Sequence, residues 1–141
     1  MYYRFRQGFT IVELLVVVAI IAVLTSVVLG SLREARDDSI EAKIKSEMLL
    51  LNKRASLEES TTLTFDVVCG SNGVPQSAPM LALINSIETF SGQSIVCNSD
   101  TEAYAVSALV ASSSYWCVDS LGSSEAVAGH LSTSSPEYAC P

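Results

Sequence analysis

The longest apolar stretch of the chain lies close to its start. It runs from Phe9 to Leu32, and between Leu14 and Leu32 no residue carries a charge. A helix needs roughly 20 apolar residues to cross the hydrocarbon core of a bilayer, so this stretch predicts a membrane-spanning helix. One acid, Glu13, lies inside the apolar stretch. An ionised carboxylate near the middle of a membrane helix costs on the order of 2.5–3.5 kcal/mol, so Glu13 needs a partner.

A second helical pattern follows the apolar stretch without a break. Five apolar residues recur three or four positions apart and would form one face of a helix: Ile40, Ile44, Met48, Leu51 and Ala55. The chain has no proline before Pro75. We therefore predict one continuous helix from Phe9 to about Leu57, apolar all round in its first half and amphipathic in its second.

The remainder of the chain predicts a small head that mixes a helix with strands. A short helix is expected from Met80 to Phe90, because Pro79 suits a first helical turn and Gly92 suits a helix end. The clearest hairpin joins a strand at 102–112, apolar on both faces, through the serines at 112–114 to a strand at 115–119. Further extended segments are predicted at 63–68, 93–97 and 126–131.

Charge is distributed unevenly along the 141 residues. All eight basic residues lie at or before Arg54, whereas residues 55–141 contain nine acids and no base. Because nucleic acid binding requires Lys or Arg to contact phosphates, we expect no direct binding of nucleic acid by the head. Arg4 and Arg6 precede the apolar stretch, which favours an amino terminus on the cytoplasmic side of a membrane.

The residues around Glu13 resemble a known processing signal. The run 8–15, GFTIVELL, is similar to the leader junction of type IV prepilins. The resemblance implies that a prepilin peptidase cuts after Gly8 and that Phe9 becomes an N-methylated amino terminus. It also implies that Glu13 pairs with the amino terminus of a neighbouring subunit during filament assembly.

The same resemblance implies a domain plan and a function. The chain would comprise a leader at 1–8, a transmembrane and filament-core helix at 9–32, an amphipathic continuation at 33–58 and a disulfide-stabilised globular head at 59–141. The implied fold class is α+β, with the long N-terminal helix packed on a small C-terminal antiparallel sheet. The subunit would be stored in the cytoplasmic membrane as a single-pass precursor. The pilus assembly machinery would then extract it into a surface filament of copies of itself.

Several other interpretations share some of these features. A secretory signal peptide would have a shorter apolar core followed by a small-residue cleavage site. A plain membrane anchor leaves the order of glycine, aromatic residue and acid unexplained. A minor pilin or a type II secretion pseudopilin would have the same subunit plan. A membrane-anchored extracellular binding module that never polymerises is the alternative from another functional class, and an anchored enzyme is a third.

Catalysis and metal binding find little support in the sequence. His130 is the single histidine, and no serine is singled out as a nucleophile for a triad with it. We therefore expect no enzymatic activity and no cofactor. Major pseudopilins carry a calcium site in a C-terminal loop, and residues 119–125 are oxygen-rich, but they lack the alternating acids of a calcium-binding loop. No metal is expected.

Gly30 lies where many type IV pilins have a helix-disrupting proline. Glycine costs about 1 kcal/mol in a helix, against roughly 3 kcal/mol for proline. The resemblance therefore indicates Val28–Leu32 as the segment that would unwind on assembly, although less obligatorily. The alternative is that Gly30 only permits close packing between helices.

The four cysteines all lie in the part of the chain predicted to be outside the membrane. They are Cys69, Cys97, Cys117 and Cys140. An even number in a small exported domain predicts two disulfides, and three pairings are compatible with the sequence. The resemblance favours Cys69–Cys97 with Cys117–Cys140, because the second bond would tie the tail to the hairpin as in many pilins. The cysteines are too far apart in sequence for a zinc-ribbon pattern.

Overall fold

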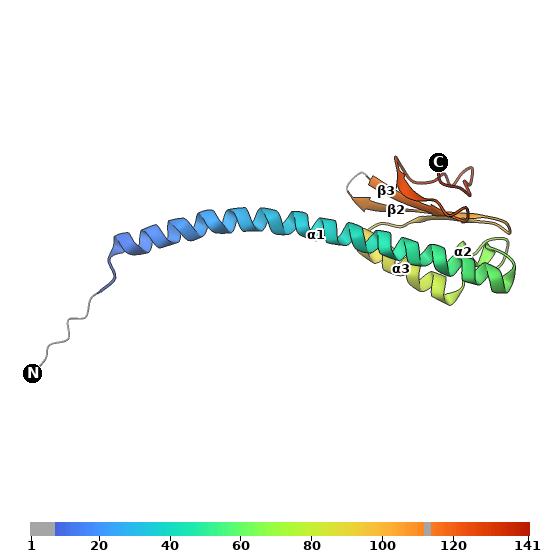
Figure 1. Ribbon diagram of the computed structural model, residues 1–141, viewed down its shortest axis with the longest axis horizontal. Coiled ribbons are helices and arrows are strands. Elements are labelled where there is room, and N and C mark those ends of the chain that lie inside the picture. The colour runs from blue at the N-terminus through green and yellow to red at the C-terminus, as the bar shows by residue number, and fades with distance from the viewer. Residues whose placement is uncertain (1–7, 112–113) are drawn as a thin grey trace, which may run out of the picture. The chain divides into compact units, whose positions relative to one another are not determined.

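A computed structural model describes residues 8–111 and 114–141 of the chain. It contains three helices, α1 (Ile11–Thr62), α2 (Asp66–Cys69) and α3 (Ala78–Ser91). Four strands follow, β1 (Val96–Ser99), β2 (Tyr104–Ala111), β3 (Ser114–Asp119) and β4 (Ser124–Val127) (Figure 1). The chain divides into two compact units, and the second unit, Asp37–Pro141, contains the whole head. The expected α+β class, with a long helix and a small antiparallel sheet, is confirmed.

Helix α1 is longer than its apolar pattern predicts. It continues past Leu57 to Thr62 and ends where Leu63 adopts a φ of 60°. The polar residues at 60–62 do not interrupt the helix, because each hydroxyl donates to a carbonyl of the preceding turn. Thr61 and Thr62 both donate to the carbonyl of Glu58, at 2.9 and 2.8 Å. These hydroxyls are thereby satisfied without competing with the helical backbone for another conformation.

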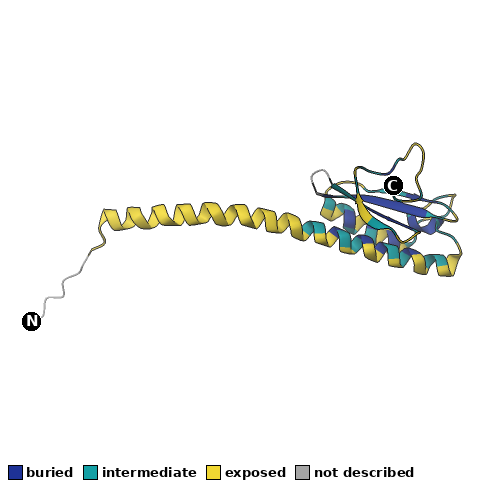
Figure 2. Cartoon of the chain, turned by 45° about the horizontal axis from the view of Figure 1, so that its top comes forward, coloured by how far each residue is buried: buried dark blue, intermediate teal, exposed yellow. Residues whose placement is uncertain are grey.

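The predicted apolar face of α1 attaches the helix to the head. Ile44, Met48, Leu51 and Ala55 are buried, and Ile40 packs at the margin of the same cluster. In Figure 2 buried and exposed residues alternate along this part of α1. The cluster also contains residues of α3 and of the sheet, including Met80, Ile87, Tyr104 and Val106. The four- and three-residue spacing thus identified the core face correctly.

The sheet has the order β1-β2-β3-β4, and every neighbouring pair is antiparallel. The predicted hairpin of β2 and β3 is confirmed, although residues 112–113 of its turn lie outside the described residues. β2 is buried on both faces, as its sequence predicts. Val106 faces the cluster shared with α1 and α3, whereas Ala105 faces a second, smaller cluster with Cys117 and Leu131.

Three of the shorter predicted strands need correction. Gln93–Cys97 was expected as a strand, but β1 begins at Val96 and extends to Ser99, where it pairs with Tyr104. The strand expected at 126–131 is instead Ser124–Val127, because only these residues lie in register with β3. Leu131 is left free to fold back and cover the outer face of the sheet.

The strand predicted at 63–68 is wrong, because a short helix, α2, forms there. The Thr64 hydroxyl accepts the Asp66 backbone N–H at 3.1 Å, which starts a local turn and competes with extended structure. Gly70 then closes the turn in the left-handed conformation with a φ of 79°. Its backbone also approaches Gln76 so closely that an added Cβ would lie 3.1 Å from the Gln76 nitrogen.

Helix α3 agrees with its prediction and begins two residues earlier. It runs from Ala78 to Ser91, with Pro79 in the first turn. Proline is tolerated there because its missing N–H has no partner in a helix. Gly92 ends the helix with a φ of 69° and donates its N–H to the Glu88 carbonyl.

Each disulfide joins a different layer to the sheet. Cys69–Cys97 connects α2 to β1 on the face that packs against the helices, and Cys117–Cys140 connects β3 to the tail on the opposite face. This is the pairing that the resemblance favours. The bonds close loops of 28 and 23 residues, and loops of this size stabilise a fold by about 3 kcal/mol each in the chain-entropy model.

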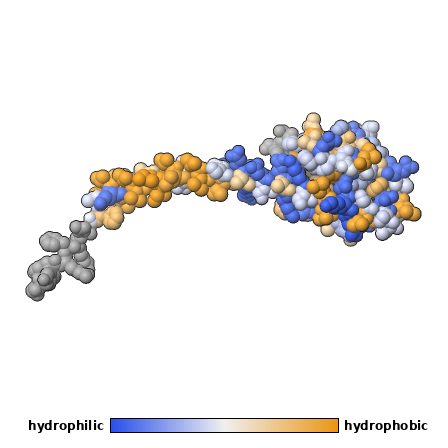
Figure 3. Space-filling model, in the orientation of Figure 1, coloured by the Kyte–Doolittle hydropathy of each residue, from blue (hydrophilic) through white to orange (hydrophobic). Residues whose placement is uncertain are grey.

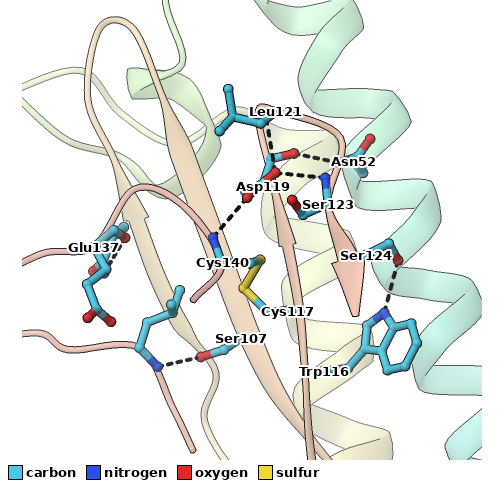
Figure 4. The surroundings of a disulfide bond; sticks show 12 residues. Asn52, Ser107, Trp116, Cys117, Asp119, Leu121, Ser123, Ser124, Glu137 and Cys140 are labelled. Carbon is cyan, nitrogen blue, oxygen red and sulfur yellow. Dashed lines mark hydrogen bonds between the residues drawn. A yellow bond between two sulfur atoms is a disulfide. The ribbon is translucent and has the colours of Figure 1, made fainter. Parts of the chain in front are cut away.

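The tail is further fixed to the sheet by hydrogen bonds to buried polar side chains. The Asn98 amide donates to the carbonyls of Ser132 and Glu137, at 2.9 and 3.1 Å. The Cys140 N–H donates to the Asp119 carboxylate at 2.8 Å, beside the Cys117–Cys140 bond (Figure 4). Three hydrogen bonds and one disulfide thus hold a segment that has no regular secondary structure.

A buried carboxylate, that of Asp66, organises the connection between α2 and α3. One of its oxygens accepts from the Ser71 hydroxyl at 2.7 Å and the Asn72 amide at 2.9 Å, and the other accepts from the Thr64 hydroxyl at 2.8 Å. The bond from Ser71, helped by those from Thr64, Asn72 and Thr101, lowers the pKa of Asp66 below its ordinary value of 3.8, against the opposing effect of burial.

This network predicts a defined dependence of stability on pH. Because the folded-state pKa of Asp66 is lowered, its contribution is complete above the unfolded-state pKa, near 3.9, and is lost as the pH falls through the folded-state value. We expect Asp66→Asn to lower the melting temperature of the detergent-solubilised chain by several degrees at pH 7. The difference from the unmodified protein should shrink as the pH approaches 3.

A matched control is Glu125→Gln, since Glu125 is exposed on β4. That variant should melt with the unmodified protein at every pH. Equal melting temperatures for Asp66→Asn and the unmodified protein at pH 7 would contradict the stabilising role of the network, as would a difference that persists unchanged to pH 3.

Candidate functional site

The predicted processing site lies in exposed, non-helical backbone immediately before α1. Gly8, Phe9 and Thr10 are all exposed, and the Phe9 side chain is 86% accessible. The helix begins only at Ile11. A protease must bind its substrate backbone in a form that a helix does not offer. The bond between Gly8 and Phe9 therefore lies before the first residue of α1, Ile11, where helical backbone would obstruct cleavage.

The start of α1 is fixed by a reciprocal pair of side chains, Thr10 and Glu13. Glu13 Oε2 accepts the Thr10 backbone N–H at 2.9 Å and the Thr10 hydroxyl at 2.7 Å. In return, the Glu13 N–H donates to Thr10 Oγ1 at 3.3 Å. The Thr10 carbonyl accepts the first helical bond, from the Leu14 N–H. This is a capping box, in which two residues satisfy each other's free donors at a helix start.

The capping box decides where the Glu13 carboxylate lies. Glu13 is in the first turn of α1, and its side chain turns back toward Thr10, next to the residue that would carry a new amino terminus. Sequence reasoning identified Glu13 as an acid that needs a partner but did not identify Thr10. The spacing of a threonine three residues before a glutamate is the signal that would have revealed it.

The apolar stretch that follows has no buried residue in the structure. In Figure 2 this part of α1 is uniformly exposed, and in Figure 3 it is almost continuously hydrophobic. By length and composition it can cross a membrane. Exposed fractions of its large side chains range from 49% at Val17 to 67% at Val27. A helix that is apolar on every side requires lipid or other apolar helices around it.

The few polar side chains of this stretch are satisfied by its own backbone. The hydroxyls of Thr25, Ser26 and Ser31 donate to carbonyls three or four residues earlier, at 2.6, 2.7 and 3.3 Å. Such bonds hide a hydroxyl from an apolar environment, where an unsatisfied polar group costs several kcal/mol. The segment therefore suits lipid despite these three residues.

Gly8 and Gly30 have no packing reason to be glycine within the single chain. A Cβ added at either position would meet no atom within 4 Å. At Gly30 the helix α1 is continuous, so the backbone there is helical in the isolated subunit. If these positions require glycine, the requirement comes from a partner rather than from the fold of the subunit.

His130 contacts Ser107 and Tyr115 on the outer face of the sheet. Its Nδ1 lies 3.1 Å from the hydroxyl of Ser107, and its ring centre lies 4.5 Å from that of Tyr115. Ser107 is fully buried, and its hydroxyl accepts the Leu131 N–H at 3.0 Å. Sequence reasoning singled out no serine near His130. Ser107 and His130 together hold the tail against β2.

The oxygen-rich loop at 119–125 is organised by Asp119. This side chain is buried, and one carboxylate oxygen accepts the N–H groups of Leu121 and Ser123, at 3.0 and 2.9 Å. The other accepts from Cys140, and the Asp119 carbonyl accepts the amide of Asn52 on α1 (Figure 4). Asp119 therefore ties together the loop, the tail and the long helix.

Comparison with known families identifies the start of the chain. Residues 3–29 match the model described as the prokaryotic N-terminal methylation motif. The matched range includes Gly8, Phe9, Thr10 and Glu13, and it ends one residue before Gly30. No curated protein and no solved structure matches the chain.

The capping box predicts the effect of changing Thr10. Thr10→Val keeps the shape of the side chain but removes the hydroxyl, and loss of such a cap costs about 1 kcal/mol. We therefore expect amide hydrogen exchange in the first turn of α1, measured by mass spectrometry in detergent, to accelerate about fivefold. Thr10→Ser retains the hydroxyl and should exchange at the original rate. Identical exchange for Thr10→Val and the unmodified chain would show that the box does not hold the helix start.

Proposed function

The chain carries the methylation motif that marks prepilins of the type IV pilin and pseudopilin kind, and we propose that it is the structural subunit of a type IV pilus filament. The observation that carries this proposal is the exposed surface of Phe9–Leu32, which is apolar on every side and contains one carboxylate at its start. Such a surface is stable in a bilayer or in a bundle of identical helices. In the proposed function the segment occupies the bilayer first and the bundle of identical helices afterwards.

In the first stage the precursor is anchored in the cytoplasmic membrane by this segment, with its amino terminus on the cytoplasmic side. A prepilin peptidase hydrolyses the exposed bond between Gly8 and Phe9, and the new amine of Phe9 is methylated. The capping box leaves this bond outside the helix and holds the Glu13 carboxylate close to the residue that becomes the terminus.

In the second stage the assembly machinery moves the subunit from lipid into a filament, where its apolar surface contacts copies of itself. Glu13 then pairs with the Phe9 amine of a neighbour. A buried ion pair adds little net stability, but an unpaired buried charge costs 3–5 kcal/mol. The pair therefore selects the register in which each subunit enters. We further propose that Val28–Leu32, around Gly30, is where the helix loosens on assembly.

The filament role is structural and assigns no catalysis to the head. The Ser107–His130 contact holds the tail in this account, and Asp119 closes its own loop. The head would form the surface of the filament, outside the cell, where two disulfides persist in an oxidising environment.

The role of Glu13 can be tested by substitution. We expect Glu13→Ala to be inserted in the membrane and to keep its head folded, because among the described residues the Glu13 side chain hydrogen-bonds only to Thr10, outside the head. Filament yield in sheared surface material should fall by at least about tenfold, the equivalent of 1.4 kcal/mol per incorporation step. The measurement is quantitative immunoblotting of sheared and membrane fractions.

The matched control is Glu34→Ala, which removes an exposed acid of the same helix just beyond the apolar stretch. This variant should assemble normally. Unchanged filament yield for Glu13→Ala would refute the assigned role of Glu13 in assembly.

A further inference from the structure

The side of α1 that faces away from the head core has an unusual composition. Between positions 42 and 60 the exposed residues of α1 include no acid, although the same segment contains three. The exposed residues are Ala42, Lys43, Ser46, Leu49, Leu50, Lys53, Ser56, Leu57 and Ser60. We call these residues, with Lys43 left out, the outer α1 face.

Of these three acids, Glu47 and Glu58 lie on one flank of the helix and form ion pairs within α1, and Glu59 is half-buried. Glu47 pairs with Lys43 at 2.6 Å, and Glu58 pairs with Arg54 at 2.8 Å. On the other flank Glu41 pairs with Lys45 at 2.6 Å, and Lys45 also lies 4.5 Å from the centre of the Trp116 ring. The three ion pairs therefore lie within α1, and only the Lys45–Trp116 contact reaches another element, β3. The outer α1 face carries no negative charge.

The outer α1 face is markedly apolar for a surface in water. Leu49, Leu50 and Leu57 are 47%, 52% and 59% exposed. Successive helical residues are rotated by about 100°, which places these leucines on the side opposite the buried Met48, Leu51 and Ala55 face, with Lys53 at their centre. Leucines clustered on one solvent-facing side indicate a contact surface rather than a random surface composition.

Charge indicates what covers this face. The ion pairs among the described residues do not include Lys53, Glu102 or Glu125, and all three are exposed. Lys53 would therefore attract an acidic surface, and residues 55–141 of this chain carry nine acids and no base. The same acidity disfavours a membrane surface as the occupant, because anionic lipids would repel the head.

We propose that the outer α1 face docks against the head of a second copy of this chain, with the leucines covered by the neighbour and Lys53 meeting a carboxylate, Glu102 or Glu125, on its surface. This rests on the proposed function, since the filament brings the copies together. It extends that function by placing a subunit contact on the head-bearing part of α1, beyond the membrane-spanning stretch.

The contact can be tested by photo-crosslinking in the assembled filament. A photoreactive phenylalanine analogue is placed at position 50, or at position 121 as the matched control, because Leu121 is also exposed, at 81%, but lies in the β3–β4 turn. We expect irradiated sheared filaments to yield a two-copy adduct from position 50 only, with its peptides mapped to a head. No adduct at position 50, equal adducts at both positions, or an adduct with another protein or lipid would overturn the proposal.

A charge exchange tests Lys53 separately. Lys53→Glu should lower filament yield about tenfold, which corresponds to 1.4 kcal/mol, while the membrane-bound subunit is still cleaved at Gly8. Combining it with Glu102→Lys or with Glu125→Lys should restore the yield in one combination. Normal assembly of Lys53→Glu, or rescue by neither combination, would overturn the ion pair between copies. Failure of the filament function itself is distinguishable, because the unmodified chain would then give no filaments.

Discussion

Removal of the Phe9–Leu32 surface from water is the constraint on which the rest of this molecule depends. Fully burying a single large aliphatic side chain is worth about 1.5–3 kcal/mol, and this segment exposes more than a dozen of them. Among the residues that the structure describes, none in this part of α1 is buried. Lipid and a bundle of identical helices are two environments that satisfy the segment, and the function proposed for this chain uses one after the other.

In the proposed filament role, the head would have to remain attached to α1 while the apolar segment changes its surroundings. Ile44, Met48, Leu51 and Ala55 embed the second part of the helix in the main core. Asn52 adds a polar connection to Asp119, which is itself bonded to the tail. Each disulfide fixes one further segment to the sheet. The same helix thus contains a segment that can cross a membrane, by its length and composition, and forms one wall of the folded head.

Features with a regular period or a local turn signal could be predicted from the sequence. The apolar face of α1, the end of α3 at Gly92 and the β2–β3 hairpin all follow from residues close together in the chain. Gly8, Phe9 and Glu13 were identified by resemblance to a short motif. The Thr10–Glu13 capping box is equally local and was accessible from its spacing.

Other features depend on contacts between distant residues and left no periodic signal. α2 forms because the Thr64 hydroxyl accepts the Asp66 N–H and because Asp66 gathers donors from the following loop and from Thr101. The position of β4 is set by its register with β3, and Leu131 then covers a face of β2. The Ser107–His130 contact joins residues 23 positions apart, so neither residue identifies the other in the sequence.

The most direct test of the central claim is mass spectrometry of the amino-terminal peptide from sheared surface material of the native cells. The account predicts an abundant subunit that starts at Phe9 and carries one added methyl group. A subunit found only in membranes, with residues ahead of Phe9 still attached, would contradict assembly into a filament and would indicate an anchored protein that does not polymerise.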